Sequence, residues 1–230
     1  MKAMILAAGR GERMRPVSDV LPKALLPAAD KPLIVWTLEN LAAAGFEEIV
    51  INHAHLGNLI EAALGDGAEF GVRIAYSPEK QALETAGGIA NALPLIGDQP
   101  FVVVNADIYC ELDFKSLLPK ARSVTESGYL AYLVMVDNPE YHRQGDFGLA
   151  QGKVTALGLP KLTYSGIGIY QPVFFAKVAR GAKAKLAPLL RSQIEAGKVG
   201  GEHYHGLWMD VGTPQRLHEL DILLRSRRAQ

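Results

Sequence analysis

Short apolar segments alternate with helix-like segments through the first half of the chain. Strands are predicted at residues 2–7, 48–52, 72–76 and 101–105, and helices at 32–44, 56–64 and 85–93. Thr85 is a plausible N-cap for the third helix. The strands show no polar alternation, which is typical of strands buried on both faces. The pattern therefore predicts an α/β fold with a mainly parallel sheet flanked by helices.

The pattern changes after about residue 113. Strands are predicted at 129–136, 162–170 and 208–211, a glycine-rich hairpin at 144–158, and helices at 188–196 and 214–225. Thr213 can cap the last helix and Pro214 can open it. The basic end RSRRAQ is interpreted as a frayed, solvated helix end. No Pro/Ser-rich linker interrupts the chain, so we expect a single domain over residues 1–230.

Composition excludes several classes of protein. Of 230 residues, 49% are hydrophobic, which is enough for a sizeable core, and 24 basic residues balance 24 acidic ones. A neutral chain has no bulk attraction to nucleic acid or to an anionic membrane, so we expect neither as a partner. The single cysteine, Cys110, excludes an internal disulfide framework. The N-terminal apolar run is too short for a membrane anchor. We expect a cytoplasmic protein, as a monomer or small homo-oligomer.

The loop after the first strand, LAAGRGERMRP, has the strongest chemical signal. Gly9 and Gly11 allow backbone N–H groups to approach an anion closely. Three basic side chains lie in the same loop, at Arg10, Arg13 and Arg15. Met14 stands where a dinucleotide-binding fingerprint needs its third glycine, and no Gly-Lys-Ser/Thr follows. The loop is therefore of a nucleotide-binding type outside these two classes, or else a surface turn with solvated arginines.

Isolated charged residues follow at the ends of other segments. Lys23 lies between the prolines of PKALLP, which we expect to hold the segment extended and fix the direction of the lysine. Asp107 follows the strand at 101–105, and Asp210 precedes a glycine turn in WMDVGTP. Carboxylates at strand ends suit Mg²⁺, although turn or capping aspartates are an alternative. The turn LETAGG opens a helix, where Gly87 and Gly88 serve either a ligand or tight packing.

Histidines and apolar residues give weaker signals. His203 and His205 in GEHYHG lie two apart, on one face of a strand, but no third metal ligand is obvious, so we favour solvated or structural histidines. His53 and His55 are interpreted in the same way. Cys110 is expected to be a small buried filler.

Four segments together resemble the sugar-1-phosphate nucleotidyltransferases: LAAGRGERMRP, PKALLP, NAD (residues 105–107) and WMDVGTP. They occur in the family's order and span almost the whole chain. The resemblance implies the nucleotide-diphospho-sugar transferase fold, with a Rossmann-like mixed, mainly parallel sheet and a small β-rich sugar-binding lobe. It also implies a nucleotide-binding half at about 1–112, a sugar-binding half at about 113–212 and a closing helix at 213–226.

Within that family, segments such as GERMRP, LETAGGI and GEHYHGLWMDVGT are most similar to the uridylyltransferases that act on N-acetylmuramate 1-phosphate in cell-wall recycling. This resemblance implies UTP and a sugar 1-phosphate as substrates and Mg²⁺ as cofactor. Another sugar 1-phosphate stays open, either glucose 1-phosphate with UTP or dTTP or mannose 1-phosphate with GTP. A non-catalytic nucleotide-sugar-binding module is a further alternative, and a dinucleotide-dependent oxidoreductase is disfavoured by Met14.

The resemblance also implies roles for individual residues. Arg13 is expected on the β- and γ-phosphates and the leaving pyrophosphate, Lys23 on the α-phosphate, and Asp107 and Asp210 on Mg²⁺. The remaining nucleotide-binding residues implied are Ala8, Gly9, Gly11, Glu12, Glu79 and Gly88. Many relatives have glutamine where this chain has Glu79, whose carboxylate is expected to accept the uracil N3–H.

The sugar side is implied by fewer positions. Asn105, Asp146 and Gly166 are the expected contacts. Many relatives have Glu-Lys-Pro before the late strand, to bind sugar hydroxyls. This chain has Gly-Leu-Pro-Lys at residues 158–161 instead, so the sugar-binding residues differ from the family pattern there.

Overall fold

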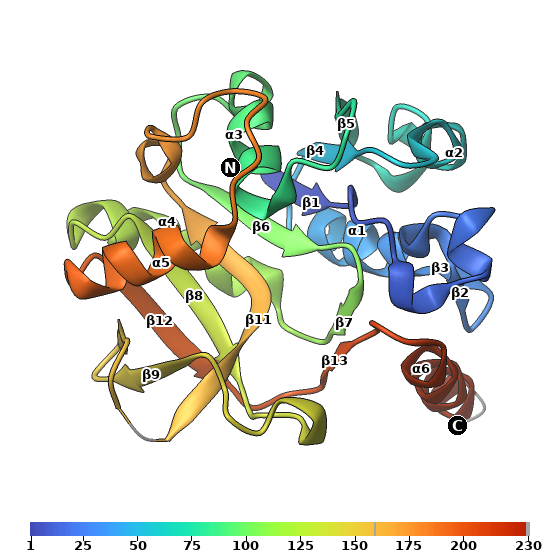
Figure 1. Cartoon of the computed structure of the whole chain (residues 1–230). Helices are drawn as coiled ribbons and strands as arrows, with labels where there is room; N and C mark the ends of the chain where they lie inside the picture. Colours follow the sequence, from blue (N-terminus) through green and yellow to red (C-terminus); the bar gives the residue numbers. More distant parts are fainter. Residues whose placement is uncertain (159, 229–230) are drawn as a thin grey trace.

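The computed structural model describes residues 1–158 and 160–228. Its centre is a nine-stranded mixed sheet with the strand order β5-β4-β1-β6-β11-β8-β12-β10-β9 (Figure 1). These strands are β1 (Ala3–Leu6), β4 (Glu48–His53), β5 (Arg73–Pro78), β6 (Phe101–Asn105), β8 (Ala131–Val136), β9 (Phe147–Ala150), β10 (Lys153–Thr155), β11 (Lys161–Tyr170) and β12 (Val199–Tyr204). Two small sheets pair β2 (Pro27–Ala28) with β3 (Lys31–Pro32), and β7 (Ile108–Cys110) with β13 (Trp208–Asp210).

The direction of the strands decides where functional side chains gather. β1 pairs in parallel with β4 and β6, and β4 with β5, as the apolar runs predict. β11 runs antiparallel between β6 and β8, and β12 is parallel to β8. Strands β6, β8 and β12 therefore point the same way, so their carboxyl ends reach the edge of the sheet where β1 and β4 also end.

Helices cover both faces of this sheet. They are α1 (Leu33–Ala43), α2 (Gly57–Leu64), α3 (Glu84–Ile96), α4 (Leu117–Glu126), α5 (Leu186–Glu195) and α6 (Pro214–Arg228). Ile5 of β1 packs in one core cluster with residues of α1, α2 and α4, whereas the adjacent Met4 packs in another with residues of α3 and α5. Burial on alternate faces explains why the strands lack polar alternation. The expected α/β architecture is confirmed.

Two predictions about helix starts have different outcomes. Thr213 does cap α6, because its Oγ1 accepts the backbone N–H of Arg216 at 3.3 Å. The prediction that Thr85 caps α3 is wrong. The helix begins one residue earlier, at Glu84, with Leu83 at the capping position and no side-chain cap.

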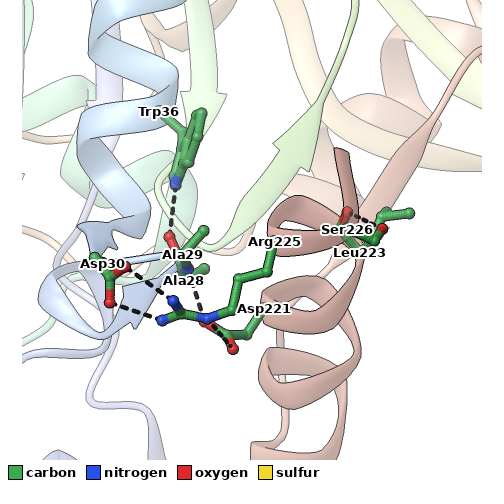
Figure 2. Close-up of polar contacts among 8 residues, drawn as sticks. All are labelled: Ala28, Ala29, Asp30, Trp36, Asp221, Leu223, Arg225 and Ser226. Carbon is green, nitrogen blue, oxygen red and sulfur yellow. Dashed lines mark hydrogen bonds and ion pairs between the residues drawn. The ribbon is translucent and has the colours of Figure 1, made fainter. Parts of the chain in front are cut away.

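The C-terminal helix α6 is held against the β2–β3 hairpin (Figure 2). The Arg225 guanidinium donates to both carboxylate oxygens of Asp30, at 2.9 and 2.7 Å, and to Asp221 at 2.9 Å. Asp221 in turn accepts the backbone N–H of Ala29 at 2.7 Å. The end is therefore helical rather than frayed as far as Arg228, which corrects that part of the prediction, whereas residues 225–228 are solvent-exposed as predicted. The last two residues lie outside the described part.

Candidate active site

Two adjoining cavities lie at the carboxyl edge of the sheet. The larger, of about 760 Å³, is formed by the ends of β1, β4 and β6 and by the loop after β1. The smaller, of about 420 Å³, is formed between β7, β11 and β13 and the segment after β8. Arg13, Asn105 and Asp107 line both cavities, so the two form a continuous site.

The loop after β1 forms one wall of the larger cavity. Six of the predicted nucleotide-binding residues line the cavity: five from this loop (Ala8, Gly9, Gly11, Glu12 and Arg13), and Lys23 from the segment that follows. Gly11 has a φ of +66°, a conformation that favours glycine. A Cβ on Gly11 would also lie 3.1 Å from the Cβ of Lys23. The glycine therefore allows the loop to close tightly over the lysine.

Lys23 reaches across the site to Asp107. Its ammonium lies 2.5 Å from Oδ2 of Asp107, and its side chain is only 9% exposed. The expectation of an extended PKALLP segment is wrong, because Lys23–Leu25 form a short 3-10 helix. The N–H of Leu25 donates to the carbonyl of Pro22, and Ala24 and Leu25 are buried in the core. This turn, rather than an extended chain, directs the lysine into the cavity.

Asp210 has its own cation, which sequence reasoning missed. Arg216, on the first turn of α6, donates through Nη1 to Oδ2 of Asp210 at 2.7 Å. Its guanidinium carbon lies 4.1 Å from the ring centroid of Tyr141. A Cβ on Gly212 would lie 2.7 Å from one Arg216 nitrogen and 2.9 Å from one Arg13 nitrogen. Two guanidinium groups therefore meet beside Asp210.

The two aspartates are brought together by the β7–β13 pairing. Asp210 lies opposite Ile108, and the N–H of Val211 donates to the carbonyl of Asp107 at 2.9 Å. Both side chains line the smaller cavity. Each carboxylate accepts a hydrogen bond through Oδ2 from its basic partner, Lys23 or Arg216. In the described part of the chain, no residue donates a hydrogen bond to Oδ1 of either aspartate. Two carboxylates that line one cavity, each with an oxygen not engaged by the described residues, fit a divalent cation that prefers oxygen ligands.

Glu79 and Gly88 lie behind the wall of the larger cavity. The side chain of Asn52 accepts the N–H of Ala7 at 3.1 Å and donates to Oε1 of Glu79 at 2.7 Å. Oε2 of Glu79 accepts the N–H of Leu83 at 2.8 Å. Burial raises the pKa of the Glu79 carboxyl group, and these two hydrogen bonds oppose the rise. A Cβ on Gly88 would lie 2.6 Å from Oε1 of Glu79, so the glycine is needed for close packing.

The expected sugar-side residues have different positions. Asn105 lines both cavities. Gly166 lies at the bulge in β11, where a Cβ would come within 2.5 Å of the Asn105 side chain. Asp146 is absent from the residues that line the cavities, and its carboxylate accepts the N–H of Tyr164 at 2.8 Å. The 158–161 segment includes residue 159, which lies outside the described residues.

Several lining residues were not among the predicted site residues, although Glu84 and Thr85 belong to the LETAGG turn described above. In the larger cavity these are Asn52, Ala82, Glu84 and Thr85, and in the smaller they are Tyr141, His142, Thr163, Tyr164, Ser165 and Trp208. Asn52 lies near the carboxyl end of β4, which is adjacent to β1, so sheet order would have placed it at the same edge. Trp208 is fixed by its indole N–H, which donates to the carbonyl of Ser165 at 2.9 Å.

Known proteins are similar to this chain over nearly its whole length. The family model described as "Nucleotidyl transferase" matches residues 2–226. The chain is 53% identical over 227 residues to N-acetylmuramate alpha-1-phosphate uridylyltransferase of Neisseria meningitidis, covering 97% of this chain and 98% of that protein. It is 38% identical over 224 residues to the protein of the same name from Caulobacter vibrioides, covering 93% and 92%.

A solved structure shows the same fold. A Bacillus anthracis protein assigned as a glucose-1-phosphate thymidylyltransferase, in complex with sucrose, superposes with a TM-score of 0.84. The two chains are 24% identical, and the match covers 98% of this chain and 95% of the other.

Proposed function

Because the chain belongs to the nucleotidyl transferase family, we propose that it transfers a uridylyl group from UTP to N-acetylmuramate 1-phosphate. The products are UDP-N-acetylmuramate and pyrophosphate. The similarity over nearly the whole length to the meningococcal uridylyltransferase is the observation that carries this choice of substrates. The cationic cavity at the carboxyl edge of the sheet supports the reaction type.

The reaction needs alignment and neutralisation of charge rather than a general base. An anionic phosphate oxygen of the sugar 1-phosphate attacks the α-phosphorus of UTP. A new P–O bond forms as the bond between the α-phosphorus and the bridging oxygen breaks, and pyrophosphate leaves with that oxygen and its electron pair. The nucleophile is already ionised, so Arg13 and Lys23 contribute by holding phosphates in line and offsetting their charge.

We assign the larger cavity to UTP and the smaller to the sugar 1-phosphate. Backbone groups of Ala8, Gly9 and Gly11, together with Glu12, face the triphosphate, and Lys23 faces the α-phosphate where the cavities meet. Asn105 lies at the same junction, next to Gly166, on the proposed sugar side. Direct contact between sugar and Asp146 stays a prediction, because that carboxylate is engaged by the backbone of Tyr164.

Glu79 acts on the nucleotide through Asn52 in this proposal. Both of its oxygens already accept hydrogen bonds, and it lies outside the residues that line the cavity. Reading of the uracil N3–H by Glu79 therefore stays a prediction that requires the carboxylate to become accessible from the larger cavity.

Mg²⁺ is the proposed cofactor, held by Asp107 and Asp210. When bound there, it supplies positive charge to phosphate oxygens at the junction of the two cavities. Lys23 hydrogen-bonds Asp107, and Arg216 hydrogen-bonds Asp210. These two cationic side chains keep the carboxylates oriented toward that junction. The 24 acidic and 24 basic residues leave no net charge, so the substrates are drawn by these local cations rather than by the whole molecule.

Two broader expectations accompany the proposal. A reaction that consumes UTP belongs in the cytoplasm, where nucleoside triphosphates are available. In the described residues no helix is both long and apolar enough for a membrane span. A monomer or small homo-oligomer stays a prediction, to be checked by the mass of the purified protein in solution.

A substrate panel tests the proposal. Purified protein with Mg²⁺ is given UTP and N-acetylmuramate 1-phosphate, and pyrophosphate release is measured. N-acetylglucosamine 1-phosphate and glucose 1-phosphate with UTP, glucose 1-phosphate with dTTP, and mannose 1-phosphate with GTP run in parallel. The proposal expects the highest kcat/KM for the first pair. A higher value for another pair would assign the chain to that substrate, and tight nucleotide binding without pyrophosphate release would make it a binding module.

A further inference from the structure

Two histidines and an aspartate meet outside the two cavities. His203 lies near the end of β12, His205 follows that strand, and Asp137 follows β8. One nitrogen of each imidazole and one carboxylate oxygen lie within 4.8 Å of one another. The third ligand that the spacing of the histidines did not reveal therefore comes from the neighbouring strand.

The register of the sheet explains the convergence. β12 pairs in parallel with β8, with His203 opposite Met135 and Tyr204 opposite Val136. The residues that follow these two strands, His205 and Asp137, are therefore neighbours where the strands leave the sheet. His203 and His205 lie two apart, so their side chains are on the same face. The paired ends of β8 and β12 therefore bring the three residues together without requiring a bound ion.

The side chains are already arranged around a common point. Nε2 of His203 lies 2.9 Å from Oδ1 of Asp137, and the two imidazole ring centroids are 3.8 Å apart. A point equidistant from three atoms 4.8 Å apart lies about 2.8 Å from each, whereas Zn–N bonds are about 2.0–2.1 Å long. A contraction of less than about 1 Å by side chains that are partly or fully exposed would complete the coordination.

We propose that Asp137, His203 and His205 form a binding site for a divalent transition metal ion of the Zn²⁺ class. Two imidazoles and one carboxylate are ligands that Zn²⁺ prefers, and the exposed fourth position is open to water. Mg²⁺ prefers oxygen ligands, so this site differs in chemistry from the Asp107–Asp210 pair. Its three ligands do not line either cavity, and the site does not depend on the proposed uridylyl transfer.

The place of this site in the fold suggests what an ion does there. Asp137 begins the segment that carries Tyr141 and His142 into the smaller cavity. An ion shared with His203 and His205 ties the start of this segment to β12. The bound ion therefore stabilises one wall of the smaller cavity.

Metal titration of the intact protein tests the inference. ZnCl₂ is titrated by calorimetry into wild-type protein with Mg²⁺ in excess, and CoCl₂ is added separately to record the visible absorption of a nitrogen-ligated site. We expect one Zn²⁺ per chain at this site. His203→Ala, His205→Ala and Asp137→Asn should each weaken binding by at least about tenfold, because even outer-shell changes at metal sites have effects of that size. Zn²⁺ at a hundred times its Kd should raise the Tm of the wild type by roughly 5–10 °C.

Two matched variants separate this site from others. His218→Ala removes an exposed histidine on α6 and should leave Zn²⁺ binding unchanged. The double variant Asp107→Asn/Asp210→Asn should also retain it. Circular dichroism confirms that each variant is folded. Binding to wild type no tighter than to His203→Ala/His205→Ala, or loss of binding in the Asp107→Asn/Asp210→Asn protein, overturns the inference.

Discussion

The ammonium group of Lys23 lies 2.5 Å from the carboxylate of Asp107, although 84 positions separate the two residues. The lysine is 9% exposed and the aspartate 38%. The pair lies where the two cavities meet, so each charge is held in place by the other before any substrate arrives. A substrate phosphate at this junction would find a cation that is already oriented.

Removal of either charge should therefore slow the reaction without unfolding the protein. We expect Lys23→Ala and Asp107→Asn each to lower kcat by about 10²–10³, the typical effect of losing one preorganised charge contact. Steady-state pyrophosphate release measures the loss, and circular dichroism checks the fold. Turnover near the wild-type rate by either folded variant rejects the role proposed for that residue.

A second lysine–carboxylate pair provides the control. Lys120 lies 2.5 Å from Glu202, outside both cavities, with side chains 27% and 28% exposed. Lys120→Ala removes an ion pair of the same length from a different surface. Its kcat should stay close to the wild-type value. A large loss of kcat in Lys23→Ala is then due to the position of Lys23 in the site and not to the loss of an ion pair in general.

Secondary structure could be predicted from the sequence where buried apolar residues are continuous or recur at a regular spacing. Phe101–Asn105 is strand β6 at the predicted bounds, because every residue but the last is buried. Helix α4 was missed because only Leu117, Ala121 and Val124 are buried, and they lie in a segment that is otherwise polar and contains Pro119. A narrow apolar stripe of this kind does not stand out from a loop.

Two predicted site residues, Asp107 and Asp210, line the smaller cavity, and their role as metal ligands stays a prediction. Asp107 and Asp210 were found because each follows or closes an apolar strand. Arg216 and Asn52 were missed because their roles depend on pairing between elements. Arg216 meets Asp210 only because α6 begins beside β13, and Asn52 meets Glu79 only because β4 and β5 are adjacent. Sequence spacing contains neither relationship.

Replacement of Glu79 by the isosteric glutamine should destabilise the protein. Both carboxylate oxygens accept hydrogen bonds, from Asn52 and from the N–H of Leu83, and Asn52 cannot flip because its oxygen accepts the N–H of Ala7. In Glu79→Gln the new NH₂ group faces one of these donors. We expect the free energy of unfolding to fall by about 1–3 kcal/mol, the cost of a buried unsatisfied donor. KM for UTP should rise severalfold, since Asn52 lines the larger cavity.

Chemical denaturation and kinetics together check this prediction. Glu69→Gln is the control, because Glu69 is exposed and takes no part in the network of Asn52, Glu79 and Leu83. It should change neither stability nor KM. If Glu79→Gln is as stable as the wild type, the hydrogen-bond network does not depend on the carboxylate.

The thiol of Cys110 should be unreactive at neutral pH. Burial raises the pKa of this thiol from 9.0 to about 11. At pH 8 only about one thiol in a thousand is ionised in the folded protein, against about one in ten in the unfolded chain. The reaction with Ellman's reagent should therefore be at least about a hundredfold slower in native protein than in guanidinium chloride. A native rate within threefold of the unfolded rate contradicts the buried position of the thiol.

The same shift predicts the sign of a pH effect on stability. The folded protein holds the thiol proton more tightly than the unfolded chain, so this contribution is complete below pH 9 and is lost as the pH rises toward 11. Unfolding in urea at a series of pH values measures the change. Cys110→Ala should show a smaller loss of stability over this interval than the wild type.

Arg216 should affect the sugar-phosphate side of the reaction more than the nucleotide side. Its guanidinium orients Asp210 and stacks on Tyr141, and both of these residues line the smaller cavity. We expect Arg216→Ala to lower kcat/KM for the sugar 1-phosphate by roughly 10–100-fold, in the range of a lost charged hydrogen bond, while KM for UTP changes little.

Arg216→Lys should recover only part of the loss, because lysine keeps the charge but not the planar stacking. Tyr141→Phe retains the ring and should behave like the wild type. Arg225→Ala is the matched control, since Arg225 lies on the same helix, forms ion pairs with Asp30 and Asp221 (Figure 2), and lines neither cavity. Equal losses for Arg216→Ala and Arg225→Ala would mean that α6 acts only as a structural element, whereas a loss confined to Arg216→Ala assigns the effect to its contacts with Asp210 and Tyr141.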